Sequence, residues 1–319
     1  MPGQPTPQDL HVNALLTNLS IGYMNPAYIA DSIFPIVKVM KQSDIVPKYN
    51  QSFWFRDDAL VRAPGTKSEG GGWTVDTSDT YFCNRFSRRI EIPDELRRNA
   101  DAPWNLDNEG ARFVTDKLMM RRDVKFATDH FATAIWTTDK DGGTDFTKWS
   151  DYGASTPDVD VDTYKDAVEA LSGVEPNKMV LGKQVHIQLK NHPTLIDRIK
   201  YTQRAQLTLD LIASLLELES YLVGRSIYTT TVEGTAEASV SYTRIWGKNA
   251  LLVYVPATPS LLTPAAGYTF TWQVVPNAIQ YIKRMRDEEK EIDIIEANSY
   301  FDQKLTSARA GAFLESAVA

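Results

Sequence analysis

FWFRDDALVRAPGTKSEGGGWTVDTSDTYFCNRFSRRIEI, residues 53–92, is the stretch that decides the fold of this chain. Its first part alternates apolar and basic residues as a strand does, with Phe53, Phe55, Arg56 and Arg62. Its middle is rich in glycine, at positions 65 and 70–72. Its last part is again strand-like and carries Trp73, Val75, Tyr81, Phe82, Phe86, Ile90 and Ile92. The pattern predicts an extended β-hairpin loop.

Such a loop needs a surface to lie on. An isolated two-stranded ribbon is marginally stable at best in water. The flanking sequence offers no separate core for these aromatic residues, so we expect the surface to belong to another copy of the chain. The aromatic and arginine residues Phe53, Phe55, Arg56, Arg62, Trp73 and Phe82 are the predicted contacts between subunits, since these residue types dominate interface hot spots.

The composition is that of a globular protein. Of the 319 residues, 43% are hydrophobic and 24% charged, and the formal net charge is −7. An acidic chain has no general attraction for nucleic acid. The single cysteine, Cys83, excludes a disulfide within the chain and indicates synthesis in a reducing compartment, and its aromatic neighbours predict a packed thiol. No apolar run reaches the length of a membrane-spanning helix, and from the first ten residues, which lack a basic start and an apolar stretch, we expect no signal peptide.

Residues 105–136 have the clearest helical pattern. Asn105 or Asp107 can cap the start of this helix. The apolar face is predicted to contain Phe113, Met120, Val124, Ala127, Phe131 and Ile135. The opposite face is predicted to be charged and exposed, with Arg112, Asp116, Lys117, Arg121, Arg122, Asp123 and Lys125. A helix of this length is typical of a spine on which other elements pack.

From residue 162 onward, helices and strands alternate. Helices are predicted at 162–172, 183–190 and 207–216, and strands at 179–181, 221–228, 250–255, 268–275, 278–285, 292–301 and 311–318. This order predicts a mixed α/β domain and an α+β chain. The last residues have no core of their own, so we expect them to return to an earlier element, the long helix.

Catalytic and metal-binding motifs are weak. His186 and His192 are six positions apart and do not share a helix face. Asp158, Asp160 and Asp162 resemble a calcium loop in spacing, but Thr163 stands where the turn requires glycine. No phosphate-binding glycine motif or nucleophile elbow occurs. We therefore predict no enzyme activity, catalytic residue, cofactor or metal. The mixed charges of Arg284, Arg286, Glu288 and Glu289 favour salt bridging between subunits over phosphate binding.

The order of these parts, with several local strings, resembles the major capsid proteins of tailed phages, which have the Hong Kong 97-type shell fold. The strings occur in consistent order over most of the chain: Asn25-Pro-Ala-Tyr-Ile-Ala-Asp-Ser-Ile-Phe-Pro35, Arg62-Ala-Pro-Gly-Thr66, Leu181-Gly-Lys-Gln-Val185, Leu189-Lys-Asn-His-Pro193, Asp197-Arg-Ile-Lys-Tyr201, Tyr221-Leu-Val-Gly-Arg225, Trp246-Gly-Lys248 and Ala266-Gly-Tyr-Thr-Phe270.

This resemblance implies five segments. Residues 1–50 would be an N-terminal arm and 51–92 the extended loop over the adjacent subunit. Residues 93–161 would form the peripheral domain with the spine helix, 162–265 the mixed α/β axial domain, and 266–319 the strands that return to the peripheral domain.

The resemblance also implies a function and partners. Hexamers and pentamers of the chain would form an icosahedral capsid in the virion, assembled in the host cytoplasm. The shell would enclose double-stranded DNA without sequence-specific binding and would not contact a membrane. A separate scaffolding protein, a portal and a decoration protein are the expected partners. A tail or decoration protein and an α/β hydrolytic enzyme are the alternatives.

Overall fold

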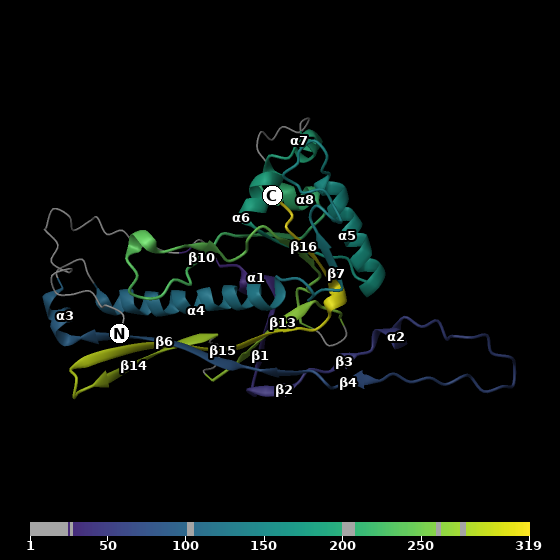
Figure 1. Cartoon of the computed structure of the whole chain (residues 1–319). Coiled ribbons are helices and arrows are strands. Elements are labelled where there is room, and N and C mark those ends of the chain that lie inside the picture. Colours follow the sequence, from purple (N-terminus) through teal and green to yellow (C-terminus); the bar gives the residue numbers. More distant parts are fainter. Residues whose placement is uncertain (1–24, 26–27, 101–104, 200–207, 260–262, 275–278) are drawn as a thin grey trace.

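The computed structural model describes residues 25, 28–100, 105–199, 208–259, 263–274 and 279–319, so the first 24 residues of the predicted arm lie outside the described part. Figure 1 shows three parts: a long sheet with helix α4 along it, an α/β body at one end of that helix, and a loop that projects far from both. This is the α+β arrangement predicted from the sequence.

β15 (Ile292–Leu305) is the central strand of the long sheet. The strand order is β1 (Ile36–Val39), β13 (Gly267–Trp272), β15 and β14 (Gln280–Asp287), and β6 (Asn84–Pro93) also pairs with β15. β6 runs antiparallel to β15 from Asn84↔Phe301 to Pro93↔Ile292. The last part of the 53–92 stretch, residues 84–92, is therefore fixed in the body of the subunit.

Helix α4 (Leu106–His130) lies over this sheet. Asn105 caps it as predicted, because its side chain accepts a hydrogen bond from the backbone N–H of Asn108. Its 25 residues span about 37 Å. The helix ends six residues before the predicted Trp136. The chain turns back there, with Ala134 at φ 62°, and the Trp136 indole donates to the carbonyl of His130 at 2.7 Å.

The predicted faces of α4 are wrong in part. The helix buries Val114, Leu118 and Phe126, whereas Phe113 is 42% exposed. Val114 and Leu118 pack on Ile92, Ile295 and Ala297 of the sheet. The sequence pattern predicted a single buried face of α4, whereas the helix has neighbours on more than one side. The sheet covers one stripe, while α1 (Ala30–Ile33) and the α/β body cover another near the C-terminal end.

Arg122 and Asp123, predicted to be exposed, are buried. Arg122 donates to both carboxylate oxygens of Asp31, at 2.7 and 2.8 Å, and to Ser299 Oγ at 2.9 Å. Asp123 accepts from the backbone N–H groups of Ile29 and Ala30 and from two side chains of the α/β body, Ser226 and Trp246. Burial raises the pKa of Asp123, and these donors oppose that rise. Both charges are tolerated because Asp123 accepts four hydrogen bonds and the terminal nitrogens of Arg122 donate to Asp31 and Ser299.

The second sheet has the order β7 (Thr138–Asp141), β16 (Gly311–Glu315), β12 (Ala250–Val253), β8 (Lys178–Gly182) and β9 (Ser220–Gly224). The expectation that the C-terminal tail returns to the long helix is wrong, because β16 lies between β7 and β12 in this sheet. Phe313 and Leu314 point to opposite faces of β16 and are both fully buried. The sheet thus takes strands from the predicted peripheral, axial and returning segments.

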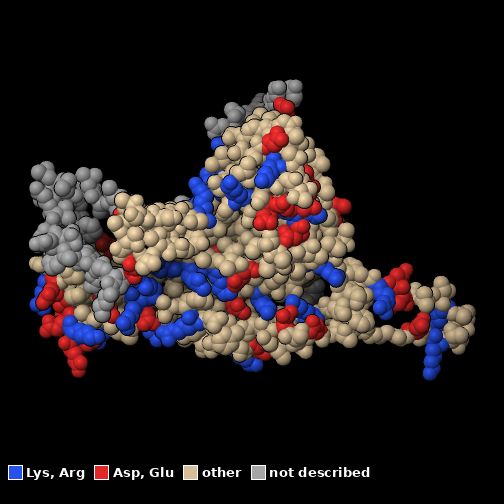
Figure 2. Space-filling view, viewed as in Figure 1, with Lys and Arg blue, Asp and Glu red and all other residues tan. Residues whose placement is uncertain are grey.

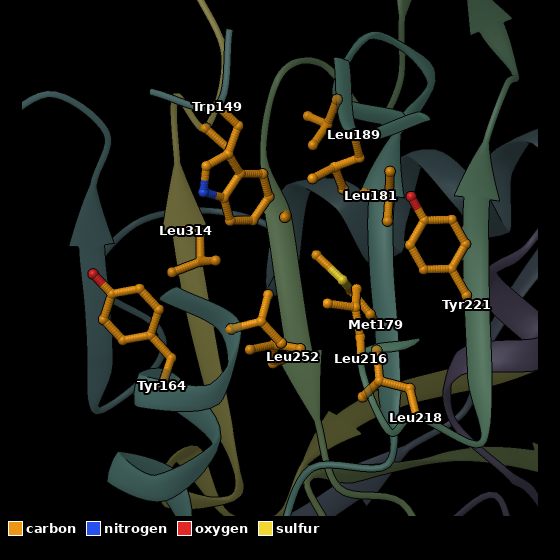
Figure 3. Packing of buried hydrophobic residues seen from close by; sticks show 14 of the residues in the cluster. Trp149, Tyr164, Met179, Leu181, Leu189, Leu216, Leu218, Tyr221, Leu252 and Leu314 are labelled. Atoms are coloured by element: carbon orange, nitrogen blue, oxygen red, sulfur yellow. The ribbon is translucent and has the colours of Figure 1, made fainter. Parts of the chain in front are cut away.

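Four helices cover one face of the second sheet: α5 (Pro157–Ser172), α6 (Lys183–Lys190), α7 (Pro193–Ile199) and α8 (Leu209–Leu215). Figure 3 shows the core between them, with Trp149, Met179, Leu181, Leu189 and Leu252 packed together. The opposite face of the sheet packs on the end of α4 through Phe126, Phe131 and Trp246. The predicted bounds of α6 are confirmed. The predicted end of α5 at residue 172 is also confirmed, with Gly173 following in the left-handed conformation, but the predicted start at 162 is wrong because the helix begins at Pro157. Helix α8 lies within the predicted range 207–216 and is capped by Thr208.

The remaining described elements are short. They include α3 (Asp94–Asn99), the hairpin of β10 (Ile227–Tyr228) and β11 (Thr243–Arg244), and two 3₁₀ turns at Glu237–Ser239 and Ala308–Ala310. Gly234, where φ is 91°, lies in the turn region between β10 and β11.

Candidate assembly surfaces

The root of the projecting loop is a short two-stranded ribbon. β2 (Ser43–Ile45) pairs with β5 (Thr80–Phe82), and β3 (Lys48–Tyr49) pairs with β4 (Val75–Asp76). The outgoing strand is therefore 43–49, and the predicted strand over 53–62 is wrong. Asn50 caps a helical turn there, α2 (Gln51–Trp54), by accepting from the backbone N–H of Ser52. This local capping signal prevails over the alternation of residue types.

Every residue from 54 to 78 is exposed. Among them are large apolar side chains, with Trp54 57%, Phe55 65% and Trp73 65% exposed. At Arg62 and Thr66 the chain forms a turn, in which the Arg62 guanidinium Nε donates to the carbonyl of Thr66 at 2.5 Å. Figure 1 shows the loop extending away from the rest of the subunit. A soluble monomer rarely exposes so much contiguous apolar surface, and such surfaces mark interaction sites.

Three aromatic side chains form a cluster near the root of the loop. The ring of Trp54 lies 5.9 Å from that of Tyr49 and 6.3 Å from that of Trp73, measured between centroids. The Arg56 guanidinium lies over the Phe53 ring at 5.6 Å. Phe82, on β5, is half exposed. The sequence pattern missed Tyr49 and Trp54. The adjacency of Phe53, Trp54 and Phe55 was the available signal for Trp54, and nothing local indicated Tyr49.

The root of the loop also touches the end of α5. The Gln51 side chain donates to the carbonyl of Leu171 at 2.7 Å and accepts from Arg309 at 3.3 Å. The Phe55 ring lies over Gly173, so closely that a Cβ on that glycine would be 2.6 Å from Phe55 Cζ. These contacts fix the direction in which the loop leaves the subunit.

The charged residues predicted to bridge subunits lie on and after β14. Arg286 is engaged within its own chain: it donates to Asp94 at 2.6 and 2.7 Å and to Asp293 at 3.3 Å. Hydrogen bonds from Arg286 hold the pKa of the Asp94 carboxyl below its usual range. Arg284, Glu288 and Glu289 are exposed. A role of these four residues between subunits stays a prediction.

The other candidate residues have structural partners. His186 Nδ1 lies 3.3 Å from the Tyr221 hydroxyl, and His192 Nε2 lies 2.9 Å from Ser155 Oγ. Asp158 pairs with Arg198 at 2.6 Å, and Asp160 accepts from the Trp149 indole at 2.9 Å. Within the described ranges, no three metal-ligating side chains come together.

Cys83 is fully buried, and burial raises the pKa of its thiol to about 12, which confirms a packed residue.

No described helix is long and apolar enough to cross a membrane.

Comparison with known proteins supports an assembly role. No protein-family model matches the chain. It is 27% identical over 311 residues to a major capsid protein of Burkholderia phage BcepMu, and the match covers 94% of each chain.

Solved structures show the same fold. A phage-related protein from Bordetella bronchiseptica RB50 superposes with a TM-score of 0.70 at 22% identity, covering 92% of this chain and 94% of that one. The capsid structure of Cyanophage P-SCSP1u superposes with a TM-score of 0.63 at 11% identity, covering 97% and 93%. The chain therefore has the Hong Kong 97-type capsid fold and is a homologue, over nearly its whole length, of the major capsid proteins of tailed phages.

Proposed function

We propose that this chain is the major capsid protein of a tailed phage and that many copies form the icosahedral head around packaged double-stranded DNA. The observation that carries the proposal is the exposure of every residue from 54 to 78, including Trp54, Phe55 and Trp73. Placing this loop on an adjacent copy would cover the apolar surface that a single subunit leaves in water.

The binding free energy of one loop on a neighbouring copy is modest, but the sum over all copies in a shell is large. Burying one aromatic side chain contributes about 2 kcal/mol, and part of this is lost to the cost of ordering the loop. In a closed shell each copy donates a loop to one neighbour and receives one from another, so the contacts act together.

The finer features of the head follow as expectations. Hexamers and pentamers would share the same loop contact, and a separate scaffolding protein would guide their curvature during assembly in the host cytoplasm. A portal and a decoration protein would join the same lattice. The net charge of −7 favours a shell that encloses DNA without binding it tightly.

The alternatives have less support. The full-length relative from Burkholderia phage BcepMu is named a major capsid protein, not a tail or decoration protein. For a hydrolytic enzyme, the histidines His186 and His192 are the expected general bases, but both are buried and hydrogen-bonded to structural residues.

The proposal is tested with the chain produced alone and together with the other head proteins of its phage. A variant that replaces residues 57–72 by a short glycine-serine linker removes the loop tip and leaves the ribbon and both sheets intact. We expect wild type to form shells visible by electron microscopy and the shortened variant to stay as soluble subunits. Val232→Ala, which trims an exposed apolar residue on the β10–β11 hairpin, is the control and should assemble normally. Shells formed by the shortened variant at the wild-type yield would contradict the proposal.

A further inference from the structure

The α/β body has two flanks of opposite charge. Its five-stranded sheet ends at β7 on one side and at β9 on the other, roughly 20 Å apart. Helix α5 packs near β7 and β16, whereas α6 packs near β8 and β9. On the α/β body in Figure 2, Lys and Arg lie where Figure 1 places α6, whereas Asp and Glu lie at the centre of this face and toward α5.

The acidic flank is the outer face of α5. Asp162, Asp166 and Glu169 recur at four- and three-residue steps and are all exposed, so they share one face of the helix. None of the three carboxylates makes an ion pair with a described residue. Val159, one turn before Asp162, is 53% exposed on the same side. Like charges at this spacing destabilise a helix by a few tenths of a kcal/mol, so helix stability does not explain this arrangement.

The basic flank has the same spacing with the opposite sign. Lys183 and Lys190 lie two turns apart on α6 with the 43% exposed Ile187 between them. Arg225, which follows β9, and Arg244 on β11 are close enough to Lys183 for their charges to act on it. None of these four cations makes an ion pair with a described residue. Burial first, and then the charges of Arg225, Lys190 and Arg244, lower the pKa of Lys183.

We propose that, in a ring of copies, the acidic flank of one α/β body (Asp162, Asp166 and Glu169) docks on the basic flank of the next copy (Lys183, Lys190, Arg225 and Arg244). This inference rests on the proposed function, in which several copies surround a common axis. A contact between two different surfaces of the same chain can repeat head to tail and close into a ring. Val159 and Ile187 would meet near the centre of the contact.

The energies of ion pairs and of like-charge repulsion show what the contact between the two flanks would contribute. An exposed ion pair contributes about 0 to 1 kcal/mol, so the flanks add little affinity. Two like flanks placed face to face cost several kcal/mol. The charges would therefore fix the direction of each copy in the ring, while the apolar loop supplies the adhesion. A bound polyanion such as DNA would satisfy the basic flank alone and leave the acidic flank unexplained.

The test reverses each flank separately and then both together in the full chain. Lys183→Glu, Lys190→Glu and Arg225→Glu together make the basic flank net negative, so that both flanks are acidic. Asp162→Lys, Asp166→Lys and Glu169→Lys together make both flanks basic. The two sets combined restore opposite flanks and the original net charge. The substituted positions lie on the surfaces of α5 and α6 or, for Arg225, in an exposed position after β9, so folding is checked by circular dichroism and the thermal midpoint. Particle yield is measured by sedimentation and electron microscopy, with the same partner proteins that support wild-type assembly.

We expect each single-flank reversal to lower the yield of closed particles at least about tenfold, and the combined variant to recover it. Either single-flank variant assembling at the wild-type yield would overturn the docking while leaving the capsid function standing. Loss in both single-flank variants without recovery in the combined variant would also overturn it. If the basic-flank reversal changed only the DNA content of normal particles, the flank would bind polyanion instead. Failure of the wild type itself to assemble would overturn the proposed function.

Discussion

The Asp123 carboxylate on α4 accepts a hydrogen bond from the backbone N–H of Ala30 at 2.9 Å, across 93 positions of sequence. The same carboxylate accepts from Ser226 at 2.8 Å and from the Trp246 indole at 3.2 Å. One buried side chain thus ties the segment before β1 and the α/β body to the spine helix. The long sheet with α4 and the α/β body are therefore joined at this residue.

Removing the Asp123 carboxylate should lower the stability of the folded chain. Asp123→Ala leaves the donors of Ile29, Ala30, Ser226 and Trp246 without their acceptor, and we expect it to lower the free energy of unfolding by about 3 kcal/mol. Urea unfolding of the unassembled chain measures the change. Asp129→Ala, which removes a partly exposed ion pair with Lys125 on the same helix, is the control and should cost less than about 1 kcal/mol. Equal effects of the two variants would contradict this role of Asp123.

The aromatic cluster of the loop should matter for assembly and not for folding. Trp54→Ala and Trp73→Ala remove side chains that are more than half exposed in the subunit, so unfolding free energy should change by no more than about 0.5 kcal/mol. Shell yield should fall strongly in both variants, because interface aromatics carry most of the binding energy. Sedimentation and urea unfolding of the same preparations separate the two effects. A loss of folding stability that matched the loss of shells would show that the cluster serves its own subunit.

Gly173 should couple the α/β body to the loop. Gly173→Ala places a methyl group against Phe55 and a non-glycine residue at φ 73°, which costs about 1 kcal/mol for the backbone alone. In the Phe55→Ala background only the backbone cost should remain. A double-mutant cycle on shell yield and on unfolding free energy measures the coupling. If the effects of the two substitutions were strictly additive, the contact between the Phe55 side chain and Gly173 would not set the direction of the loop.

Much of the fold was predictable from local signals. The cap at Asn105, the bounds of α6 and the glycine that ends α5 depend on residues within one helical turn of the feature. The excursion at 53–92 was predictable in part from the aromatic residues that the neighbouring sequence could not bury, but its last part, residues 84–92, pairs with β15 in the same subunit. The exposure of residues 54–78 agrees with that prediction.

The errors occur where distant parts of the chain meet. Arg122 and Asp123 resemble solvent-facing residues in sequence, and only their partners Asp31, Ser226 and Trp246 make burial possible. The position of β16 between β7 and β12 depends on pairings across more than 60 residues of chain, which no local pattern contains. The outgoing strand of the loop was misplaced because Asn50 starts a helical turn immediately before the alternating residues.

Acid should weaken the α/β body through His186. Burial lowers the pKa of His186 to about 4, from an ordinary value of 6.5. Between these values the unfolded chain binds a proton that the folded chain does not, so stability is present above pH 6.5 and is lost as the pH falls toward 4. We expect this loss to be about 1 to 3 kcal/mol.

His186→Gln keeps a polar group beside Tyr221 and cannot titrate, so its unfolding free energy should depend less on pH in this window. Urea unfolding at a series of pH values measures the difference. The carboxylates Asp94 and Asp293 have lowered pKa values, so their contribution is lost only below about pH 4 and does not interfere. Identical pH profiles for the variant and the wild type would contradict the assignment.

An electron cryomicroscopy map of assembled particles tests the central claim most directly, because it shows what covers residues 54–78. The account predicts that Trp54, Phe55 and Trp73 lie against an adjoining copy of the chain. Density that folded this loop back onto its own subunit, or left it free in solvent within a closed particle, would contradict the account.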